Sequence, residues 1–152
     1  MESKVKVVEE EHGDFQWSAN KDKTVFTLLK DAKITLTLND GKKYTFAFKK
    51  GFICDGLSVP KAFQWFLPRW LDKNMLYNLA GVVHDSLYAD KGYKIFTRDD
   101  SDAIFRGLLR MAGCNRFHAS MADFMLGIFA KSHWGDDTFN CKDLVKLTVK
   151  WV

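Results

Sequence analysis

The residues best suited to chemistry are a histidine and an aspartate that stand together inside an apolar stretch, Leu79 to Tyr88. Apolar residues recur in this stretch at three- and four-residue spacing. This predicts a helix with His84 on its buried stripe and Asp85 at the edge of that stripe. A histidine and a carboxylate set against a core cost solvation energy unless each has a partner. The stretch therefore predicts half of a site, whose partners must come from elsewhere in the chain.

Asp102 is the predicted partner of His84. It precedes Phe105 by three residues and Leu109 by seven, so a helix would turn its carboxylate inward together with these apolar side chains. An imidazole that binds a carboxylate through one nitrogen keeps the other free to take a proton from water or an alcohol. The pair thus predicts the general base of a hydrolase.

Asp85 would then point to the rim of the site, where a carboxylate suits a hard cation. The segment from Gly51 to Ser58 holds two glycines and an acid, Asp55. Its backbone carbonyls and the Asp55 carboxylate are therefore further predicted oxygen ligands. On this interpretation the candidate metal ligands are Asp85 and Asp55.

A purely structural interpretation fits the same residues. His84 would be a core histidine bonded to Tyr88 or Asp102, and the acids at the start of the next helix would be favoured by the helix dipole. His133, beside Trp134, has no acidic partner at helical spacing and is not predicted to act. The residue types and spacing leave both interpretations open.

The first third of the chain is predicted to form the sheet against which these helices pack. Three segments alternate with a period of two: 25–29, 34–38 and 44–48. Asp40-Gly41 between the last two is typical of a tight hairpin turn. The pattern predicts an antiparallel meander of three or four strands with one face packed.

Helix signals follow from residue 51 onward. Ser58 and Pro60 predict the start of a short aromatic helix over 62–67, and Asp72 is a predicted N-cap of the helix that ends near Tyr88. The next helix is predicted to begin with a capping box at Thr97 and to end near Ala112.

A last helix is predicted over 116–131, with Phe124 and Met125 among its inward residues. Residues 144–151 then alternate like a strand that could rejoin the first sheet. The predicted fold class is α+β: an N-terminal antiparallel β-meander, a bundle of three to four helices and a C-terminal strand. We expect a single domain over 1–152, with 1–50 mainly β-sheet, 51–135 a helical block and 136–152 a closing loop and strand.

Composition narrows the classes of function. Apolar residues make up 47% of the 152 residues, and the net charge is +4 with the basic residues scattered, so nucleic acid is not an expected partner. The three cysteines have no metal spacing and are predicted to be free thiols. Neither a signal peptide nor a transmembrane segment is expected, which predicts synthesis in the cytosol.

A group of motifs resembles a family of uncharacterised proteins that is widespread in tailed phages and prophages. The matching residues, in chain order, are Gly51-Phe52, Asp55-Gly56, Ser58, Pro60, Trp65, His84-Asp85, Leu87-Tyr88, Asp102 and Phe105. The resemblance implies a phage origin, with the host cytoplasm during infection or the virion as the place of action. It implies no particular activity.

The His-Asp-x-x-Tyr pattern at 84–88, followed by Asp102-x-x-Phe105, also resembles the catalytic core of secreted-type phospholipases A2. This resemblance implies that His84 is the base that activates water and that Asp85 binds calcium. It also implies that Tyr88 and Asp102 hold the histidine. The Gly-x-Gly calcium loop of that family has no counterpart close before His84, and the segment 51–58 is the only candidate for its role.

Two hypotheses follow, and they belong to different classes. The first is a phage-encoded, calcium-assisted ester hydrolase with a phospholipase A2-like site and a lipid or other ester as substrate. The second is a non-catalytic phage protein, either a virion component or an inhibitor that binds a host protein. The aromatic stretch 63–70 would be a lipid-facing rim in the first case and the protein contact surface in the second. A metal-dependent phosphohydrolase would need more histidines on neighbouring helices than the pattern supplies.

Overall fold

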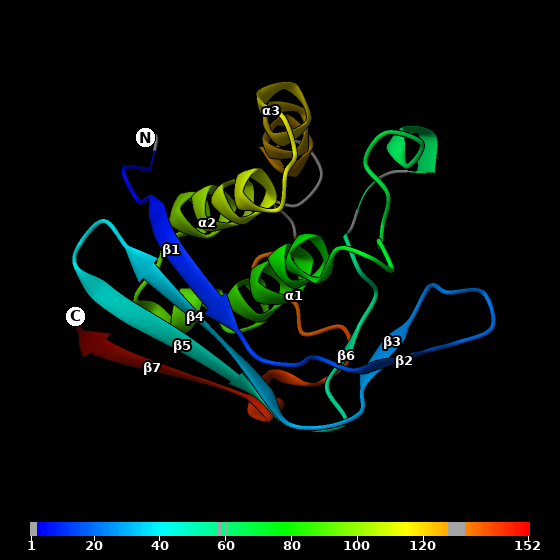
Figure 1. The fold of residues 1–152 in the computed structure, drawn as a ribbon, viewed down its shortest axis with the longest axis horizontal. Helices are drawn as coiled ribbons and strands as arrows, with labels where there is room; N and C mark the ends of the chain where they lie inside the picture. Colours follow the sequence, from blue (N-terminus) through cyan, green and yellow to red (C-terminus); the bar gives the residue numbers. More distant parts are fainter. Residues whose placement is uncertain (1–2, 58, 60, 128–132) are drawn as a thin grey trace.

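A computed structural model describes residues 3–57, 59, 61–127 and 133–152 of the chain, and these form an α+β fold (Figure 1). The strands are β1 (Val7–His12), β2 (Trp17–Ala19), β3 (Phe26–Leu28), β4 (Ala32–Leu38), β5 (Lys42–Phe48), β6 (Ile53–Cys54) and β7 (Val145–Trp151). The α-helices are α1 (Met75–Ala89), α2 (Arg98–Met111) and α3 (Arg116–Met125). Three 3-10 turns are η1 (Lys61–Phe63), η2 (Lys91–Lys94) and η5 (Lys142–Leu144). The predicted fold class is confirmed.

The larger sheet has the strand order β1-β4-β5-β7 and is antiparallel throughout. The predicted hairpin joins β4 to β5, and Gly41 adopts a φ of +79° at its turn, a conformation that glycine accepts without strain. β7 pairs with β5 over its whole length, from Lys42 opposite Trp151 to Phe48 opposite Val145. The predicted return of the C-terminal strand to the first sheet is therefore confirmed.

A smaller sheet has the strand order β2-β3-β6. It contains β3, which the alternation over 25–29 had placed in the same sheet as β4 and β5. β3 pairs with β2 and β6 instead of continuing into β4. The indole of Trp70 stacks on Phe26 with ring centroids 3.8 Å apart, which buries the inner face of this small sheet. The expectation of one sheet was wrong because β3 pairs on one side with β6, a two-residue strand after β5 that the alternation did not reveal.

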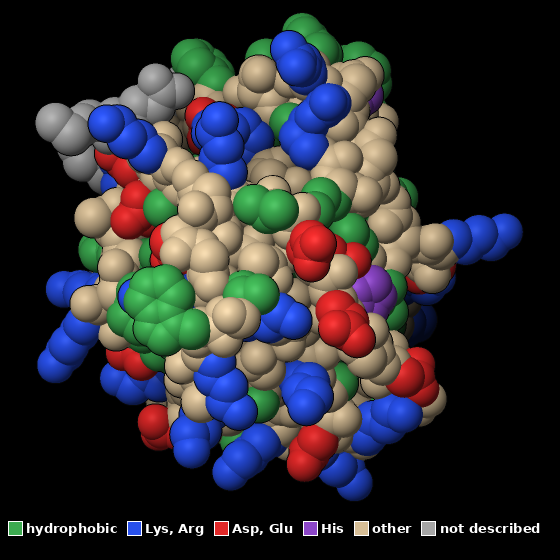
Figure 2. Space-filling view, turned by 60° about the vertical axis from the view of Figure 1, so that its left-hand side comes forward, with side chains coloured by type: hydrophobic (Ala, Val, Ile, Leu, Met, Phe, Trp, Pro, Cys, Tyr) green, Lys and Arg blue, Asp and Glu red, His purple; other side chains and the backbone are tan. Residues whose placement is uncertain are grey.

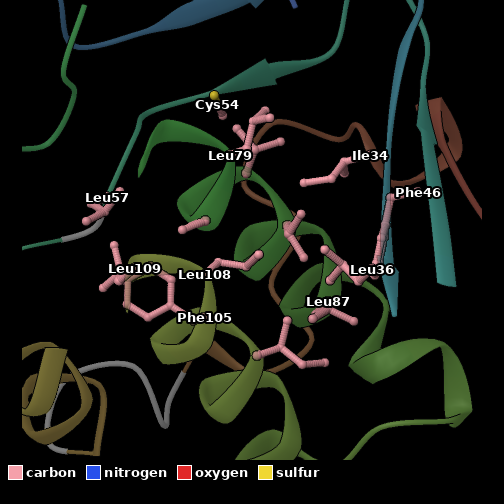
Figure 3. Close-up of a cluster of buried hydrophobic side chains, with 14 of the residues drawn as sticks. Ile34, Leu36, Phe46, Cys54, Leu57, Leu79, Leu87, Phe105, Leu108 and Leu109 are labelled. Carbon is pink, nitrogen blue, oxygen red and sulfur yellow. The ribbon is translucent and has the colours of Figure 1, made fainter. Parts of the chain in front are cut away.

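The core lies between the larger sheet and helices α1 and α2, which cover one face of that sheet (Figure 1). Alternate residues of β4 and β5, including Ile34, Leu36 and Phe46, point inward and are almost fully buried. Figure 3 shows Leu79 and Leu87 of α1 between these side chains and those of α2. α1 is thus the central helix of the fold, which explains its apolar character on nearly every side.

Polar side chains cap α1 and α2, and one of these caps also joins the two helices. Asn74, and not the predicted Asp72, is the N-cap of α1, because its side chain accepts a hydrogen bond from the backbone N–H of Tyr77. The Asn74 amide also donates to the carbonyl of Ala112, just after α2 ends. At the other end the predicted capping box is confirmed, with Thr97 as N-cap and Asp100 as its reciprocal partner. The Asn74 amide therefore joins the start of α1 to the end of α2, whereas the capping box stabilises only the start of α2.

Two predicted helices differ in extent. Between residues 61 and 67 the described backbone forms only the 3-10 turn η1 and further turns, and the proposed helix start at Ser58 and Pro60 lies outside the described residues. α3 begins at the cap Asn115, and the predicted continuation over 128–131 is also outside them. Met125 is buried as expected, whereas Phe124 is 62% exposed, contrary to the prediction.

The charged surface has no single sign. Figure 2 shows a face on which Lys and Arg side chains are widely spread, with Asp and Glu side chains between them. Among the described residues, no helix is long and apolar enough to cross a membrane.

Candidate functional site

His84, Tyr88 and Asp102 meet between α1 and α2. The Nε2 atom of His84 lies 2.9 Å from Oδ1 of Asp102, and the hydroxyl of Tyr88 donates to the same oxygen at 2.6 Å. All three residues are buried, with at most 7% of their surface exposed. The inward turn of Asp102 and its contact with His84 are as predicted.

The surroundings fix the orientation of the imidazole. The ring centroid of His84 is 4.2 Å from that of Tyr88 and 4.8 Å from that of Phe105, so an aromatic residue from each helix lies against it. A carboxylate can only accept, so the bond to Asp102 places a proton on Nε2 and leaves Nδ1 unprotonated in the neutral ring. The structure therefore presents Nδ1 as the basic nitrogen.

Arg98 is a charged neighbour of the His84–Asp102 pair that the sequence pattern did not reveal. Its Nη1 atom lies 4.0 Å from Oδ2 of Asp102, one helical turn earlier on α2. The positive charge faces the carboxylate oxygen that His84 does not use. The spacing of four residues between Arg98 and Asp102 could have indicated this contact, because residues four apart lie on the same face of a helix.

His84 and Asp85 line a pocket of about 340 Å³. Asp55 lines the same pocket from the segment after β6, so the predicted metal candidates and the predicted base share one space. The opposite wall comes from the segment 133–145, which includes His133, Asp136 and Lys142. A pocket of this size, partly apolar and with convergent polar groups, is typical of a small-molecule site.

The wall at 133–145 was missed by the sequence patterns, which treated it as a polar loop. Nδ1 of His133 lies 3.4 Å from Oδ2 of Asp136, so this histidine does have an acidic partner, contrary to expectation. Asp137 accepts hydrogen bonds from the backbone N–H groups of Cys141 and Lys142, which shapes the wall. The Asp136-Asp137 pair after a glycine was the only local signal.

Asp55 reaches the pocket because its neighbour is held very close to another part of the backbone. Gly56 has a φ of +74°, and a Cβ atom there would lie 2.5 Å from the carbonyl oxygen of Arg69. The N–H of Leu57 donates to that same carbonyl at 2.9 Å. Glycine is therefore required beside Asp55 for both its left-handed backbone and its lack of a side chain.

Burial raises the pKa of Asp85 well above the usual range of a carboxyl group, and the negative charge of Asp55 raises it further. Asp85 keeps part of its surface in the pocket but is otherwise surrounded by protein. Burial also raises the pKa of Asp55, although the charge of Arg69 opposes that rise. Burial disfavours the charged forms of both carboxyl groups, and the charge of Asp55 disfavours that of Asp85 as well. A bound cation would stabilise the charged forms.

The donor set suits a hard cation such as calcium. Carboxylate oxygens are its preferred ligands, and backbone carbonyls and water complete its shell. Within the described residues, no three His, Cys, Asp or Glu side chains lie close enough together to hold a metal ion. Asp85 and Asp55 would therefore be the side-chain ligands, and the remaining ligands would be backbone and water oxygens.

The nearby cysteines are not suited to act as nucleophiles. Burial raises the pKa of the Cys54 thiol, and the charge of Asp85 raises it further. Cys141 lines the pocket, but it is buried and its thiol donates to the carbonyl of Phe139. Among the described side chains that line the pocket, the remaining candidates for chemistry include imidazole and carboxylate groups.

Comparison with known proteins gives a family but no activity. A family model described as "Protein of unknown function (DUF1353)" matches residues 28–125, which is more than half of the chain. This span runs from the end of β3 to the end of α3 and includes His84, Tyr88, Asp102 and both candidate metal ligands. No curated protein and no solved structure matches the chain.

Proposed function

The chain belongs to the DUF1353 family of proteins of unknown function, and we propose that it is a calcium-assisted ester hydrolase of phage origin with a phospholipase A2-like site. His84 is the base, Asp102 and Tyr88 position it, and Asp85 with Asp55 holds the metal. The place of action is the host cytoplasm during infection or the virion. The expected membership of an uncharacterised family holds, and the phage origin and the chemistry are parts of this proposal.

The observation that carries the proposal is the arrangement around the His84 ring. One ring nitrogen is bound to a carboxylate that also accepts from Tyr88. The same histidine lines a pocket of about 340 Å³. A buried histidine with a purely structural role has no need of such a space, whereas a general base must reach both an orienting acceptor and a substrate.

In the proposed reaction, His84 removes a proton from a water molecule in the pocket. The water oxygen forms a bond to the ester carbonyl carbon, and the C–O bond to the leaving alcohol then breaks. The imidazolium gives its proton to the leaving oxygen, so the histidine returns to its neutral form. Asp102 stabilises the imidazolium while it exists and keeps the ring in one orientation.

Calcium, when bound at Asp85 and Asp55, supplies positive charge for the carbonyl oxygen as it becomes negative. Asp85 follows His84 directly in α1, so the proposed base and the proposed metal ligand are joined by a single peptide link of a rigid helix. The contacts of Tyr88 and Asp102 agree with the roles that the phospholipase A2 resemblance implies for them, which supports the proposal.

The alternative is a non-catalytic phage protein, a virion component or an inhibitor of a host protein, in which the cluster is architectural. The strong exposure of Trp65, at 81%, is the observation that favours a binding role. The two functions make different demands on His84. Replacement should abolish hydrolysis in the first case and only reduce stability in the second.

The test is hydrolysis of a soluble short-chain fluorogenic ester, measured with calcium and with a chelator. His84→Asn should remove the calcium-dependent activity while the circular dichroism spectrum stays unchanged. His12→Asn is the matched control, because His12 on β1 also pairs with a carboxylate, that of Glu10 at 2.9 Å, but lies away from the pocket. Absence of activity in the wild-type protein, together with no effect of calcium on Tm, would reject the proposal.

A further inference from the structure

Three large aromatic side chains stand out from the surface near the candidate site. Trp65 is 81% exposed, Phe117 65% and Phe124 62%. Phe117 and Phe124 are seven residues apart on α3 and so lie on one face of that helix. Trp65 comes from the segment after η1 (green, upper right in Figure 1). Exposed apolar groups of this size are usually a binding surface.

Ring contacts join the two segments into one surface. The centroids of Trp65 and Phe66 are 4.8 Å apart, those of Phe66 and His118 5.7 Å, and those of His118 and Phe117 5.8 Å. The rings therefore form a continuous chain from the 61–67 segment to the start of α3. We call this set, together with Phe124, the aromatic surface.

The charges around the aromatic surface are basic. Lys61 at the start of η1 and Arg116 at the start of α3 are both exposed. The nearest acid on α3 is Asp123, which is held in an ion pair with Arg106 at 2.8 Å. A surface with exposed aromatic rings and free basic groups fits the boundary of an anionic bilayer, where rings insert between head groups and cations meet phosphates.

The two segments that bear the aromatic surface also reach the candidate site. A narrow cleft of about 20 Å³ is lined on one side by His84 and Asp85. Its other walls are Val59 and Leu67 from the segment that bears Trp65, and Met125 from the helix that bears Phe124. The inner sides of these two segments therefore contact the site, while their outer sides carry the exposed rings.

We propose that the aromatic surface docks the protein onto an anionic lipid bilayer and so makes a lipid ester the substrate class of the His84 site. The membrane contact stands on the exposed rings and their basic neighbours, and only the choice of substrate rests on the proposed hydrolase function. Trp65, Phe117 and Phe124 insert into the head-group region, and Lys61 and Arg116 contact lipid phosphates.

A second copy of the chain fits this surface less well. In a two-fold dimer the same patch lies on both sides of the interface. Lys61 and Arg116 would then meet a patch that is also basic, and the local acid Asp123 is already paired. An anionic bilayer offers a partner for each of these charges, so the lipid surface is the better occupant.

The test is co-sedimentation of the full chain with vesicles of phosphatidylcholine, with and without phosphatidylglycerol, in the presence of chelator. Wild type should bind the anionic vesicles, and added salt should weaken the binding. A Trp65→Ser, Phe117→Ser, Phe124→Ser variant should bind roughly a hundredfold more weakly, because three inserted rings are lost. Lys61→Glu with Arg116→Glu should reduce binding to anionic vesicles only.

Trp151→Ser is the matched control, because Trp151 is 73% exposed on β7 but does not belong to the aromatic surface. The Trp151→Ser variant should bind vesicles as strongly as wild type does. Failure of wild type to bind vesicles would overturn the proposal, as would an equal loss in the control. A wild-type dimer that the triple variant dissociates, without vesicle binding, would overturn it in favour of self-association.

The soluble-ester assay separates the two proposals. If vesicle binding is lost in the triple variant and soluble-ester hydrolysis is retained, both proposals are supported. If vesicles bind but no ester is hydrolysed, the membrane contact holds and the hydrolase proposal fails.

Discussion

Nε2 of His84 lies 2.9 Å from Oδ1 of Asp102, across the contact between α1 and α2. The two residues are 18 positions apart in the chain, and each is buried. The same oxygen of Asp102 accepts from Tyr88, and Arg98 faces its other oxygen. The histidine is thus oriented by a carboxylate that is itself held on two sides.

Replacement of Asp102 by Asn should keep the shape of the side chain but remove its negative charge. The imidazolium that forms during proton transfer would lose its partner, so kcat should fall by roughly 10²–10⁴. KM for the soluble ester should change little. Equal activity of wild type and Asp102→Asn, in protein of unchanged Tm, would show that Asp102 does not position a base.

Tyr88→Phe removes one donor from the Asp102 carboxylate. We expect the free energy of unfolding to fall by about 1–2 kcal/mol, as is usual when a buried charged acceptor loses a hydrogen bond. Activity should fall as well, because the carboxylate is less firmly held. Tyr44→Phe is the control: the Tyr44 hydroxyl donates to Asp40, in the hairpin away from the pocket, so its loss should leave kcat unchanged. Urea unfolding and ester hydrolysis measure both effects.

Asp85 should make the metal-free protein less stable as the pH rises. Its pKa is raised in the folded state by burial and by Asp55, while in the unfolded chain it is about 3.9. Between these two values the folded state binds more protons, so the free energy of unfolding decreases with increasing pH.

Asp85→Asn should therefore be more stable than wild type near neutral pH in chelator, and this difference should shrink as the pH falls toward 4. Thermal melts across this range provide the measurement. Calcium should raise the Tm of wild type and not that of Asp85→Asn. A calcium response that is the same in both proteins would exclude Asp85 as a ligand.

Gly56→Ala should destabilise the fold through its contact with Arg69. The new Cβ would lie 2.5 Å from a backbone carbonyl, which cannot move as freely as the end of a side chain. Gly41→Ala is matched to it, because Gly41 has a similar φ of +79° but open space around it. The free energy of unfolding should fall by roughly 1–3 kcal/mol more for Gly56→Ala than for Gly41→Ala. Similar losses in both variants would mean that only the backbone conformation matters at Gly56.

Elements with local signals could be predicted from the residues alone. Alternation fixed β4, β5 and β7, the Asp40-Gly41 turn fixed the hairpin, and Thr97 with Asp100 fixed the start of α2. It also predicted the His84–Asp102 contact, since a buried polar group must find a partner and helical spacing turned both residues inward. Alternation, turn residues and helix caps each depend on only a few neighbouring residues. An apolar core favours inward apolar side chains wherever it forms, so such signals can be interpreted without knowing the fold.

Features that depend on segments far apart in the chain could not be predicted in this way. β3 pairs with β2 and β6 and so belongs to a second sheet, and Trp70 stacks on its Phe26. Asn74 replaces Asp72 as the cap of α1 because its amide also reaches the carbonyl of Ala112. Phe124 follows the apolar pattern of a buried residue, yet among the described residues its ring stays 62% exposed.

The pocket wall at 133–145 and the approach of Arg98 to Asp102 likewise follow from how the elements pack. The pairing of strands and the packing of helices bring these side chains together. Neither produces a repeating pattern in the sequences of the segments that come into contact. Local spacing therefore predicted the contact between the proposed base, His84, and its partner acid, Asp102. The space in which that base could act became visible only when the chain was folded.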